Sequence, residues 1–357
     1  MLLLFFCIVL VFSVSAHAVG LQPEDFGADQ VAAALPDAAV DAFGTLSVSE
    51  AADLPARLEQ LWAFLTGQGQ DVFFSAMRSA GAILLITFLT ALCGVFTASK
   101  WVSLCGMISL SVLSLEHVSS CLRVGLEALE QLNSFSMVLL PCLSTASFVS
   151  GAVTSAGVKY GASMLFFDGI IGVMLKFAVP ILYGYLAVML SARMTDNPML
   201  QSMTNLLRQG MKWVLILISV CFTLYLSITG LLASTADAAA AKTAKTVLSS
   251  ALPVVGSILS DASAALLGGA AMVRNGVGVI GLLAVLALCV TPYLTLGVHY
   301  LLYRAAAILA QSYCGKSAGS VLDGFGDVFA FLLGMVGTAS LILFVSVISM
   351  MKAVGVG

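Results

Sequence analysis

Hydrophobic residues in this chain form long runs that alternate with short polar segments. A helix of about 20 apolar residues crosses the hydrocarbon layer of a bilayer, which is roughly 30 Å thick. Runs near this length cover residues 77–96, 102–115, 135–156, 163–190, 213–233, 277–298 and 328–351. The pattern therefore predicts an all-α, polytopic membrane helix bundle with about six to eight membrane elements.

Two neighbouring segments have alternative interpretations. Residues 102–115 are short and contain four serines, which fits either a short span or a half-inserted hairpin. Residues 116–133 then place charged side chains such as Arg123 and Glu127 opposite a leucine stripe. This pattern is typical of an amphipathic linker helix at the membrane interface.

The segment 237–278 is the most polar patterned stretch within the hydrophobic body. From Leu248 to Leu266, apolar residues recur at alternating spacings of four and three, whereas Asp261 lies off that face. This periodicity predicts an amphipathic helix over residues 247–266, which either lies in the membrane interface or turns its polar side toward a cavity. The alternative is a simple loop.

The N-terminus predicts an exported protein. An apolar run at residues 2–14 precedes Ala16-His17-Ala18, which has small residues at the −3 and −1 positions of a signal-peptidase site. We expect a signal peptide over residues 1–18, cleaved after Ala18. The first residues contain no Lys or Arg, so an upstream start codon or an uncleaved anchor is the alternative.

Residues 19–76 differ in character from the hydrophobic body. They contain nine acidic residues against a single base, Arg57, together with three prolines. Such a segment is too short and polar to bury a sizeable core, so we expect a mostly helical extracytoplasmic arm. A leucine stripe from Leu54 to Leu65 would dock on the membrane surface or on a partner. The acidity argues against a nucleic-acid partner.

The overall composition agrees with a membrane protein. Of the 357 residues, 60% are hydrophobic and 9% are charged, against about 25% charged in soluble domains. The basic residues of the short loops divide evenly between the two sides of the predicted bundle. The positive-inside rule therefore does not fix the orientation.

Signatures of catalysis and metal binding are absent from the sequence. The eight cysteines occur singly, without a CxxC motif, and we expect buried thiols. The motifs GxxxxGK[ST], HExxH and GxSxG are missing, and the three histidines are far apart in sequence. Asp323 and Asp327 are interpreted as partners of a helix N-terminal dipole. We therefore expect no enzyme activity, no cofactor and no metal.

Asp168 and Lys176 are charged residues inside the otherwise apolar run 163–190. A charge at the bilayer centre costs roughly 3 kcal/mol, so each should face protein or water. The two lie about 12 Å apart along a helix and do not pair directly. Either Asp168 lies near the interface and Lys176 snorkels, or both belong to a polar path in which Asp168 makes a buried contact.

Repeated spacings suggest an internal duplication. A separation of 112 positions relates Pro141 to Pro253, Gly169 to Gly281, and Pro180 to Pro292. The chain would then consist of a first membrane hairpin and amphipathic linker at 77–134, followed by halves at 135–233 and 234–357. The second half would be inverted relative to the first, as in many transporters. Chance spacing is the alternative.

An ordered series of residues in the second half closely resembles the stage III sporulation protein AE family of endospore-forming bacteria. The series is Asp237, Lys242-Thr243-Ala244-Lys245, Pro253-Val254-Val255-Gly256, Asp261-Ala262, Asn275-x-Val277-Gly278-x-x-Gly281-Leu282, Cys289, Pro292, Tyr303, Ala305-Ala306 and Gln311. No single motif of this series is specific for the family, but the motifs in this order are.

The resemblance implies a membrane component of the secretion-like channel complex that joins the mother cell to the forespore. It implies a role in late forespore gene expression and forespore maintenance, and a location in the mother-cell membrane around the forespore. The implied partners are the other membrane proteins and the ATPase of the same operon and, indirectly, the forespore-side channel protein. The alternative function is a free-standing secondary transporter with inverted repeats.

Two sets of residues follow as candidates. The polar residues expected to carry function are Asp168, Lys176, Asp237, Lys242, Lys245, Asp261, Arg274 and Asn275. The residues expected to be structural are Pro180, Pro253, Gly256 and Pro292. Lys242 and Lys245 fall on one helical face, where an acid such as Asp237 or Asp261, or lipid phosphate, would meet them.

Overall fold

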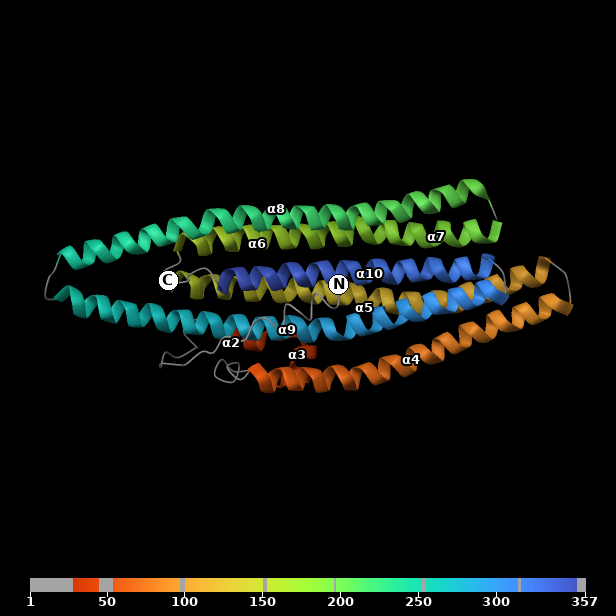
Figure 1. Ribbon diagram of the computed structural model, residues 1–357, viewed down its shortest axis with the longest axis horizontal. Helices are drawn as coiled ribbons and strands as arrows, with labels where there is room; N and C mark the ends of the chain where they lie inside the picture. The colour runs from red at the N-terminus through yellow and green to blue at the C-terminus, as the bar shows by residue number, and fades with distance from the viewer. Residues whose placement is uncertain are drawn as a thin grey trace.

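The computed structural model describes residues 28–44, 54–96, 100–149, 153–195, 197–251, 255–313 and 316–351, and these residues are all-helical, as predicted. The helices are α2 (Ala28–Ala33), α3 (Asp37–Phe43), α4 (Leu54–Phe96), α5 (Lys100–Val149), α6 (Val153–Val173), the π-helical η3 (Met174–Ala178), α7 (Val179–Thr195), α8 (Pro198–Ala251), α9 (Val255–Tyr313) and α10 (Lys316–Met351). The long helices run nearly side by side along one axis (Figure 1).

Six segments of the described chain are long and apolar enough to cross a membrane. They are Glu59–Cys93, Cys105–Phe148, Lys159–Thr195, Pro198–Tyr225, Asn275–Ser312 and Ala318–Met351. The number agrees with the predicted six to eight membrane elements. Some helices are far longer than a span: α8 and α9 have 54 and 59 residues, or about 81 and 88 Å of helix.

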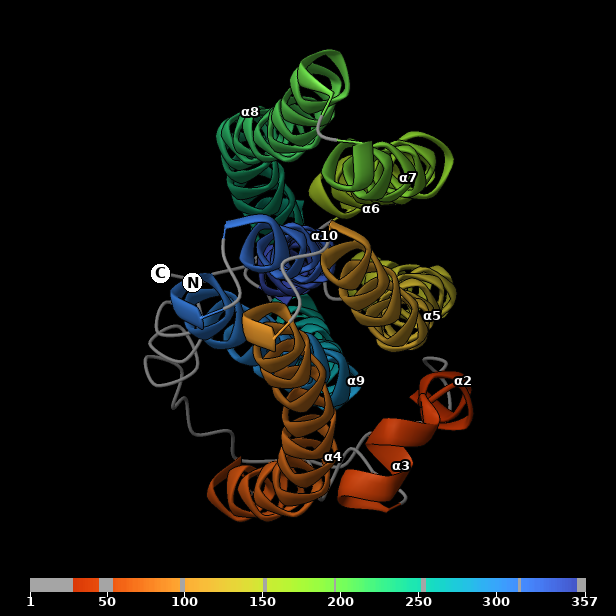
Figure 2. The same ribbon diagram turned by 90° about the vertical axis from the view of Figure 1, so that its right-hand side faces the viewer.

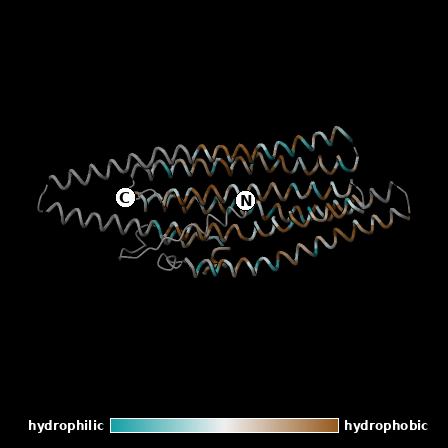
Figure 3. Tube along the Cα trace, viewed as in Figure 1, coloured by the Kyte–Doolittle hydropathy of each residue, from teal (hydrophilic) through white to brown (hydrophobic). Residues whose placement is uncertain are grey.

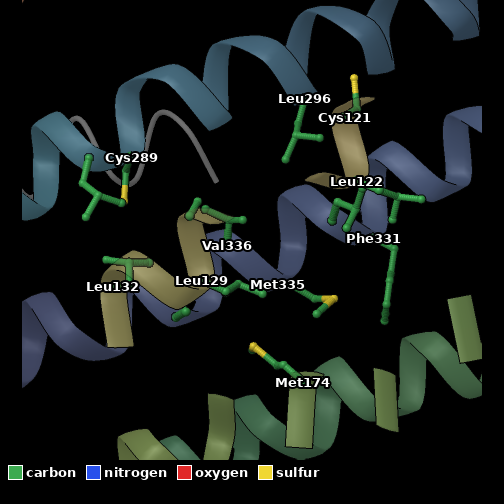
Figure 4. Packing of buried hydrophobic residues seen from close by; sticks show 14 of the residues in the cluster. Cys121, Leu122, Leu129, Leu132, Met174, Cys289, Leu296, Phe331, Met335 and Val336 are labelled. Atoms are coloured by element: carbon green, nitrogen blue, oxygen red, sulfur yellow. The ribbon is translucent and has the colours of Figure 1, made fainter. Parts of the chain in front are cut away.

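The central helix of the bundle is α10. It packs against α5, α6, α7, α8 and α9, whereas α4 packs mainly on α9 and α5. Viewed along the bundle, α10 lies between α5, α9 and the α6–α8 group, with α4 on the far side of α9 (Figure 2). The core is formed where α5, α9 and α10 meet, and Leu129, Met335 and Cys289 belong to it (Figure 4).

The outer helices present apolar side chains to the outside of the bundle. Exposed large hydrophobic residues on α4 include Phe74 and Phe88, and those on α8 include Leu206 and Trp213. Parts of the outer helices are accordingly as hydrophobic as the inner helices (Figure 3). Cys93 and Cys105 are also exposed, contrary to the expectation of buried thiols, whereas Cys121, Cys142 and Cys289 are buried.

Several predicted element boundaries are wrong. One continuous helix, α5, contains residues 102–115, 116–133 and much of 135–156. The leucine stripe of the predicted interfacial linker does not face the membrane interface, because Leu122 and Leu129 are buried inside the bundle. Residues 54–96 likewise form a single helix, α4, without a break at residue 76. In α5, Pro141 lies inside the helix.

The predicted helix over residues 247–266 is also divided. One helix, α8, ends at Ala251, and the next, α9, begins at Val255. Pro253 lies in the segment between them, outside the described residues. Proline has no amide hydrogen and disfavours helix in the residue before it, so the division at this point has a local cause.

The N-terminal arm packs on the bundle itself. Val31 of α2 and Ala39 and Phe43 of α3 are buried, and the two short helices contact α4, α5 and α9. Arg57 Nη1 donates a hydrogen bond to the carbonyl oxygen of Phe43 at a distance of 3.4 Å. The described part of the arm therefore docks on its own chain. The predicted signal cleavage at Ala18 lies outside the described residues.

Candidate functional site

A cluster of charged side chains joins four helices within the apolar body. Arg208 comes from α8, Arg304 from α9, and Asp323 and Asp327 from α10; Tyr185 of α7 completes the group. Asp323 and Asp327 are four residues apart, so both project from the same face of α10. We call these five residues the ion-pair cluster.

Asp327 is the centre of the ion-pair cluster. One of its oxygens, Oδ1, accepts hydrogen bonds from Arg208 Nη2 at 2.6 Å and from Arg304 Nη2 at 2.8 Å. The other oxygen, Oδ2, accepts a hydrogen bond from the hydroxyl of Tyr185 at 3.0 Å. One carboxylate therefore holds side chains from α7, α8 and α9 against α10.

Asp323 supplies the second carboxylate. It forms an ion pair with Arg304, and its Oδ2 lies 3.9 Å from Arg208 Nη2. The guanidinium of Arg304 also lies over the ring of Tyr300, 5.5 Å from its centroid, within the range of a cation–π interaction. Two arginines and two aspartates balance to zero net charge, which reduces the cost of placing four charges among apolar helices.

Burial is uneven across the ion-pair cluster. The side chain of Asp327 is 10% exposed, whereas those of Arg208, Arg304 and Asp323 are 30–36% exposed. Asp323 is seven residues from the start of α10, and Arg304 is nine residues from the end of α9. These separations place the cluster about 10–14 Å from the adjoining ends of α9 and α10, and α4 and α5 extend beyond those ends (Figure 1).

The chemistry of the cluster favours helix coupling over catalysis or metal binding. Both carboxylates are occupied by guanidinium groups, and no nucleophile or histidine is part of the cluster. Among the described residues, no group of three or more His, Cys, Asp or Glu side chains is placed to hold a metal ion. The Nε of Arg208 is buried without a hydrogen bond to a described residue. The arrangement fixes α8 to the α9–α10 pair.

A second polar contact holds the other end of α10. Lys159, a buried residue of α6, donates a hydrogen bond from Nζ to the carbonyl oxygen of Ser349 at 2.9 Å. The carbonyl groups of the last helical turn lack intrahelical partners, and a cation there also complements the helix dipole. Polar contacts to other helices therefore anchor α10 near both of its ends.

The interpretation of Asp323 and Asp327 as dipole partners is wrong. Helix α10 begins at Lys316, so both carboxylates lie beyond its first turn and bind arginines instead. Arg208 and Arg304 were among the basic residues assigned to the short loops, and Tyr185 was not among the predicted site residues. One signal was available: carboxylates and arginines close to apolar runs require partners within the protein.

Asp168 and Lys176 are both exposed on the outside of the bundle, in α6 and η3. Neither makes a hydrogen bond or ion pair with any residue that the structure describes. The expected buried contact of Asp168 is therefore wrong for the single chain, because that side of α6 faces away from the core. Pro180, in α7, is exposed as well, whereas Pro292 is buried inside α9.

The structure describes only part of the polar stretch 237–278. Asp237, Lys242 and Lys245 lie on α8, and Gly256, Asp261 and Arg274 lie on α9, but their side chains are outside the described part. Asn275 is half-buried on α9. The functional roles of these residues stay predictions.

Comparison with known proteins gives one consistent family. A family model described as stage III sporulation protein AE matches residues 70–355. A relative described as stage III sporulation protein AE, from Bacillus subtilis (strain 168), is 23% identical over 238 residues, which cover 66% of this chain. The match spans 59% of the length of that relative. No solved structure matches this chain.

Proposed function

This chain belongs to the stage III sporulation protein AE family, and from that premise we propose that it is a membrane component of the secretion-like channel complex connecting mother cell and forespore during endospore formation. The observation that carries the proposal is the extent of the family match, residues 70–355, which includes five candidate spans completely and most of the first. In this role the protein supports late forespore gene expression and forespore maintenance.

The architecture supports an assembly role rather than an enzymatic one. The described chain is a multi-pass bundle whose charged cluster is internally neutralised and whose outer helices expose large apolar side chains. Helices in a membrane associate through packing and polar contacts, since lipid is as apolar as their side chains. The proposed partners are the other membrane proteins of the same sporulation operon. Because the chain has no nucleotide-binding motif, the operon's ATPase would supply the energy.

The proposed location is the mother-cell membrane around the forespore. The test is a deletion of the gene in its native endospore-forming host, complemented with a tagged copy. We expect loss of heat-resistant spores, loss of a late forespore reporter, and recovery of operon membrane proteins with the tagged copy. Normal sporulation of the deletion strain would contradict the proposal. A protein that purifies alone and moves a solute in vesicles would instead favour the free-standing transporter.

Within this function we propose that the polar stretch 237–278 contacts a partner or lipid headgroups. Lys242 and Lys245 are three residues apart on α8, so they occupy one helical face. If lipid phosphate is the contact, replacing both by Arg preserves sporulation and replacing both by Ala reduces it. If a specific partner is the contact, even the Arg pair fails, because a planar guanidinium does not replace a compact ammonium. Wild-type behaviour of both pairs and of Asp261→Asn would make this stretch a linker.

A further inference from the structure

Lys176 lies at the middle of the membrane span Lys159–Thr195, on the outside of the bundle. It is 17 residues from one end of the span and 19 from the other, or about 26 and 28 Å along a helix. The segment is about 54 Å of helix, which is longer than a hydrocarbon layer roughly 30 Å thick. Next to Lys176 on the outer surface lie exposed apolar side chains, Val173 and Phe177.

The backbone around Lys176 is also unusual. Residues Met174–Ala178 form a π-helical turn, and the amide of Val179 donates to the carbonyl of Met174, five residues earlier. Pro180 has no amide hydrogen, so the carbonyl of Lys176 lacks its normal α-helical donor. Wide turns of this kind inside membrane helices frequently mark functional positions.

The π-turn separates an inward from an outward set of side chains. Met174 and Ala178 are buried, and Met174 points toward the core residues of α5 and α10 (Figure 4). Lys176 and Phe177 are exposed. The turn thus keeps α6 and α7 packed on the bundle while it directs the lysine away from it.

The surface around Lys176 has room for a second helix. Positions 168, 172, 176, 180 and 184 follow at intervals of four and lie along one helical stripe, which we call the Lys176 face. A Cβ added at Gly172 or Gly184 would meet no atom within 4 Å. Small residues at such positions allow close approach of another helix backbone in a membrane. Asp168 adds an opposite charge to this face, two helical turns before Lys176.

We propose that the Lys176 face binds a transmembrane helix of a different membrane protein, which carries a carboxylate at the depth of Lys176. A lysine within the hydrocarbon layer costs up to roughly 3 kcal/mol, and a carboxylate on the bound helix offsets this cost. The bound helix fits best if it also carries a basic or hydrogen-bonding residue opposite Asp168, two helical turns from its carboxylate. The inference is independent of which complex supplies the helix, so it stands apart from the proposed function.

A second copy of this chain does not fit the Lys176 face in a two-fold symmetric contact. Two copies in one membrane are related by an axis along the membrane normal, so an isologous contact brings equal depths together. Lys176 would then face Lys176, and Asp168 would face Asp168, and both contacts are repulsive. Charge complementarity therefore points to a heterologous helix with an acidic residue.

The test places the photo-crosslinker p-benzoylphenylalanine at Phe177 in the full-length protein, in its native host. Trp213, which is similarly exposed on α8, is the control position. We expect a crosslinked heteromer from position 177, with the attachment site mapped by mass spectrometry to a membrane span that contains Asp or Glu near that site. Lys176→Glu should lower the crosslink yield about tenfold, the effect of losing one favourable contact of about 1.4 kcal/mol, and Lys176→Arg should retain it.

A charge exchange makes the result specific. Replacing the mapped carboxylate by Lys should restore crosslinking to the Lys176→Glu variant. Crosslinks only to lipid, or to a second copy of this chain, would overturn the proposal, as would an unchanged yield with Lys176→Glu at equal membrane abundance. If Lys176→Glu does not accumulate in the membrane, Lys176→Gln supplies the same comparison, because it removes the charge without reversing it.

Discussion

The α9–α10 pair and helix α8 illustrate two ways of holding an apolar helix in place. In their most apolar stretches, 72% of α9 and 67% of α10 is buried inside the protein, against 11% of α8. The pair is surrounded by other helices, whereas α8 presents residues such as Leu206 and Leu217 to the outside. Packing therefore fixes α9 and α10, but it leaves most of the surface of α8 without a protein neighbour over Pro198–Tyr225, the part whose side chains the structure describes.

The difference shows why charged residues lie where they do. Lipid solvates the outward face of α8 as well as protein does, so apolar burial gives little preference for one docked position. The ion pair between Arg208 and Asp327 supplies that preference, because separating the two charges within the membrane is costly. Specific polar contacts are needed most at the helix that is packed least.

The strongest test removes the centre of the ion-pair cluster. We expect Asp327→Ala to destabilise the protein by about 3 kcal/mol, since two guanidinium groups and a tyrosine hydroxyl lose their shared acceptor. The measurement is unfolding by SDS titration in mixed micelles. Glu127→Ala is the control, because its ion pair with Arg123 is exposed and 3.8 Å long, and it should cost under about 1 kcal/mol. Equal losses for the two variants would show that the cluster does not hold α8.

A leucine from each region tests the contrast in packing. Leu288 of α9 is buried in the core, and Leu288→Ala should cost about 2–3 kcal/mol because it leaves a cavity. Leu217 of α8 is 61% exposed, and Leu217→Ala should cost less than about 0.5 kcal/mol. The same SDS titration compares them. A large loss at Leu217 would indicate that α8 packs against another protein under the conditions used.

Two glycines that correspond in the suggested duplication lie in opposite environments. A Cβ at Gly281 would lie 2.6 Å from Leu139 Cδ1 of α5, so Gly281→Ala should destabilise by about 1–2 kcal/mol through overpacking. A Cβ at Gly169 meets nothing within 4 Å, so Gly169→Ala should be neutral or stabilising by up to about 1 kcal/mol. Thermal unfolding in detergent distinguishes the signs. Equal destabilisation at both positions would contradict the packing difference.

The smallest expected effect concerns the tyrosine hydroxyl of the cluster. Tyr185→Phe removes the donor to Asp327 Oδ2 and should cost about 1 kcal/mol. Tyr183, two residues earlier on α7, is 51% exposed, and Tyr183→Phe should change stability by less than about 0.5 kcal/mol. Thermal unfolding of both variants in detergent is the measurement. An equal loss of stability in the two variants would show that the hydroxyl of Tyr185 does not contribute to the ion-pair cluster.

The sequence predicted some boundaries better than others. The runs 277–298 and 328–351 fall within α9 and α10, because continuous apolar composition alone defines them. The division of α5 into three segments failed, since serines at positions such as Ser111 return their hydroxyl hydrogen bonds to the helix backbone and do not interrupt it. Local polarity therefore indicated breaks where the backbone remains helical.

The candidate site was beyond the reach of sequence alone. Arg208 and Asp327 are 119 positions apart, and nothing in their local sequence pairs them. Asp323 and Asp327 lie close to the start of a helix in sequence, so the helix dipole was the only partner that their neighbours along the chain indicated. Lys176 and Asp168 were identified from sequence, but the side of the bundle to which they point was not.

By itself the sequence determined the all-α class, the membrane location of its apolar runs and the resemblance to a sporulation family. These properties depend on composition, run length and residue order. The tertiary structure alone decided which helices are central, which arginines meet which aspartates, and which face of α6 and α7 is open. The physical reason is that a helix face in contact with lipid and one in contact with protein are both apolar, so periodicity does not distinguish them in a membrane protein.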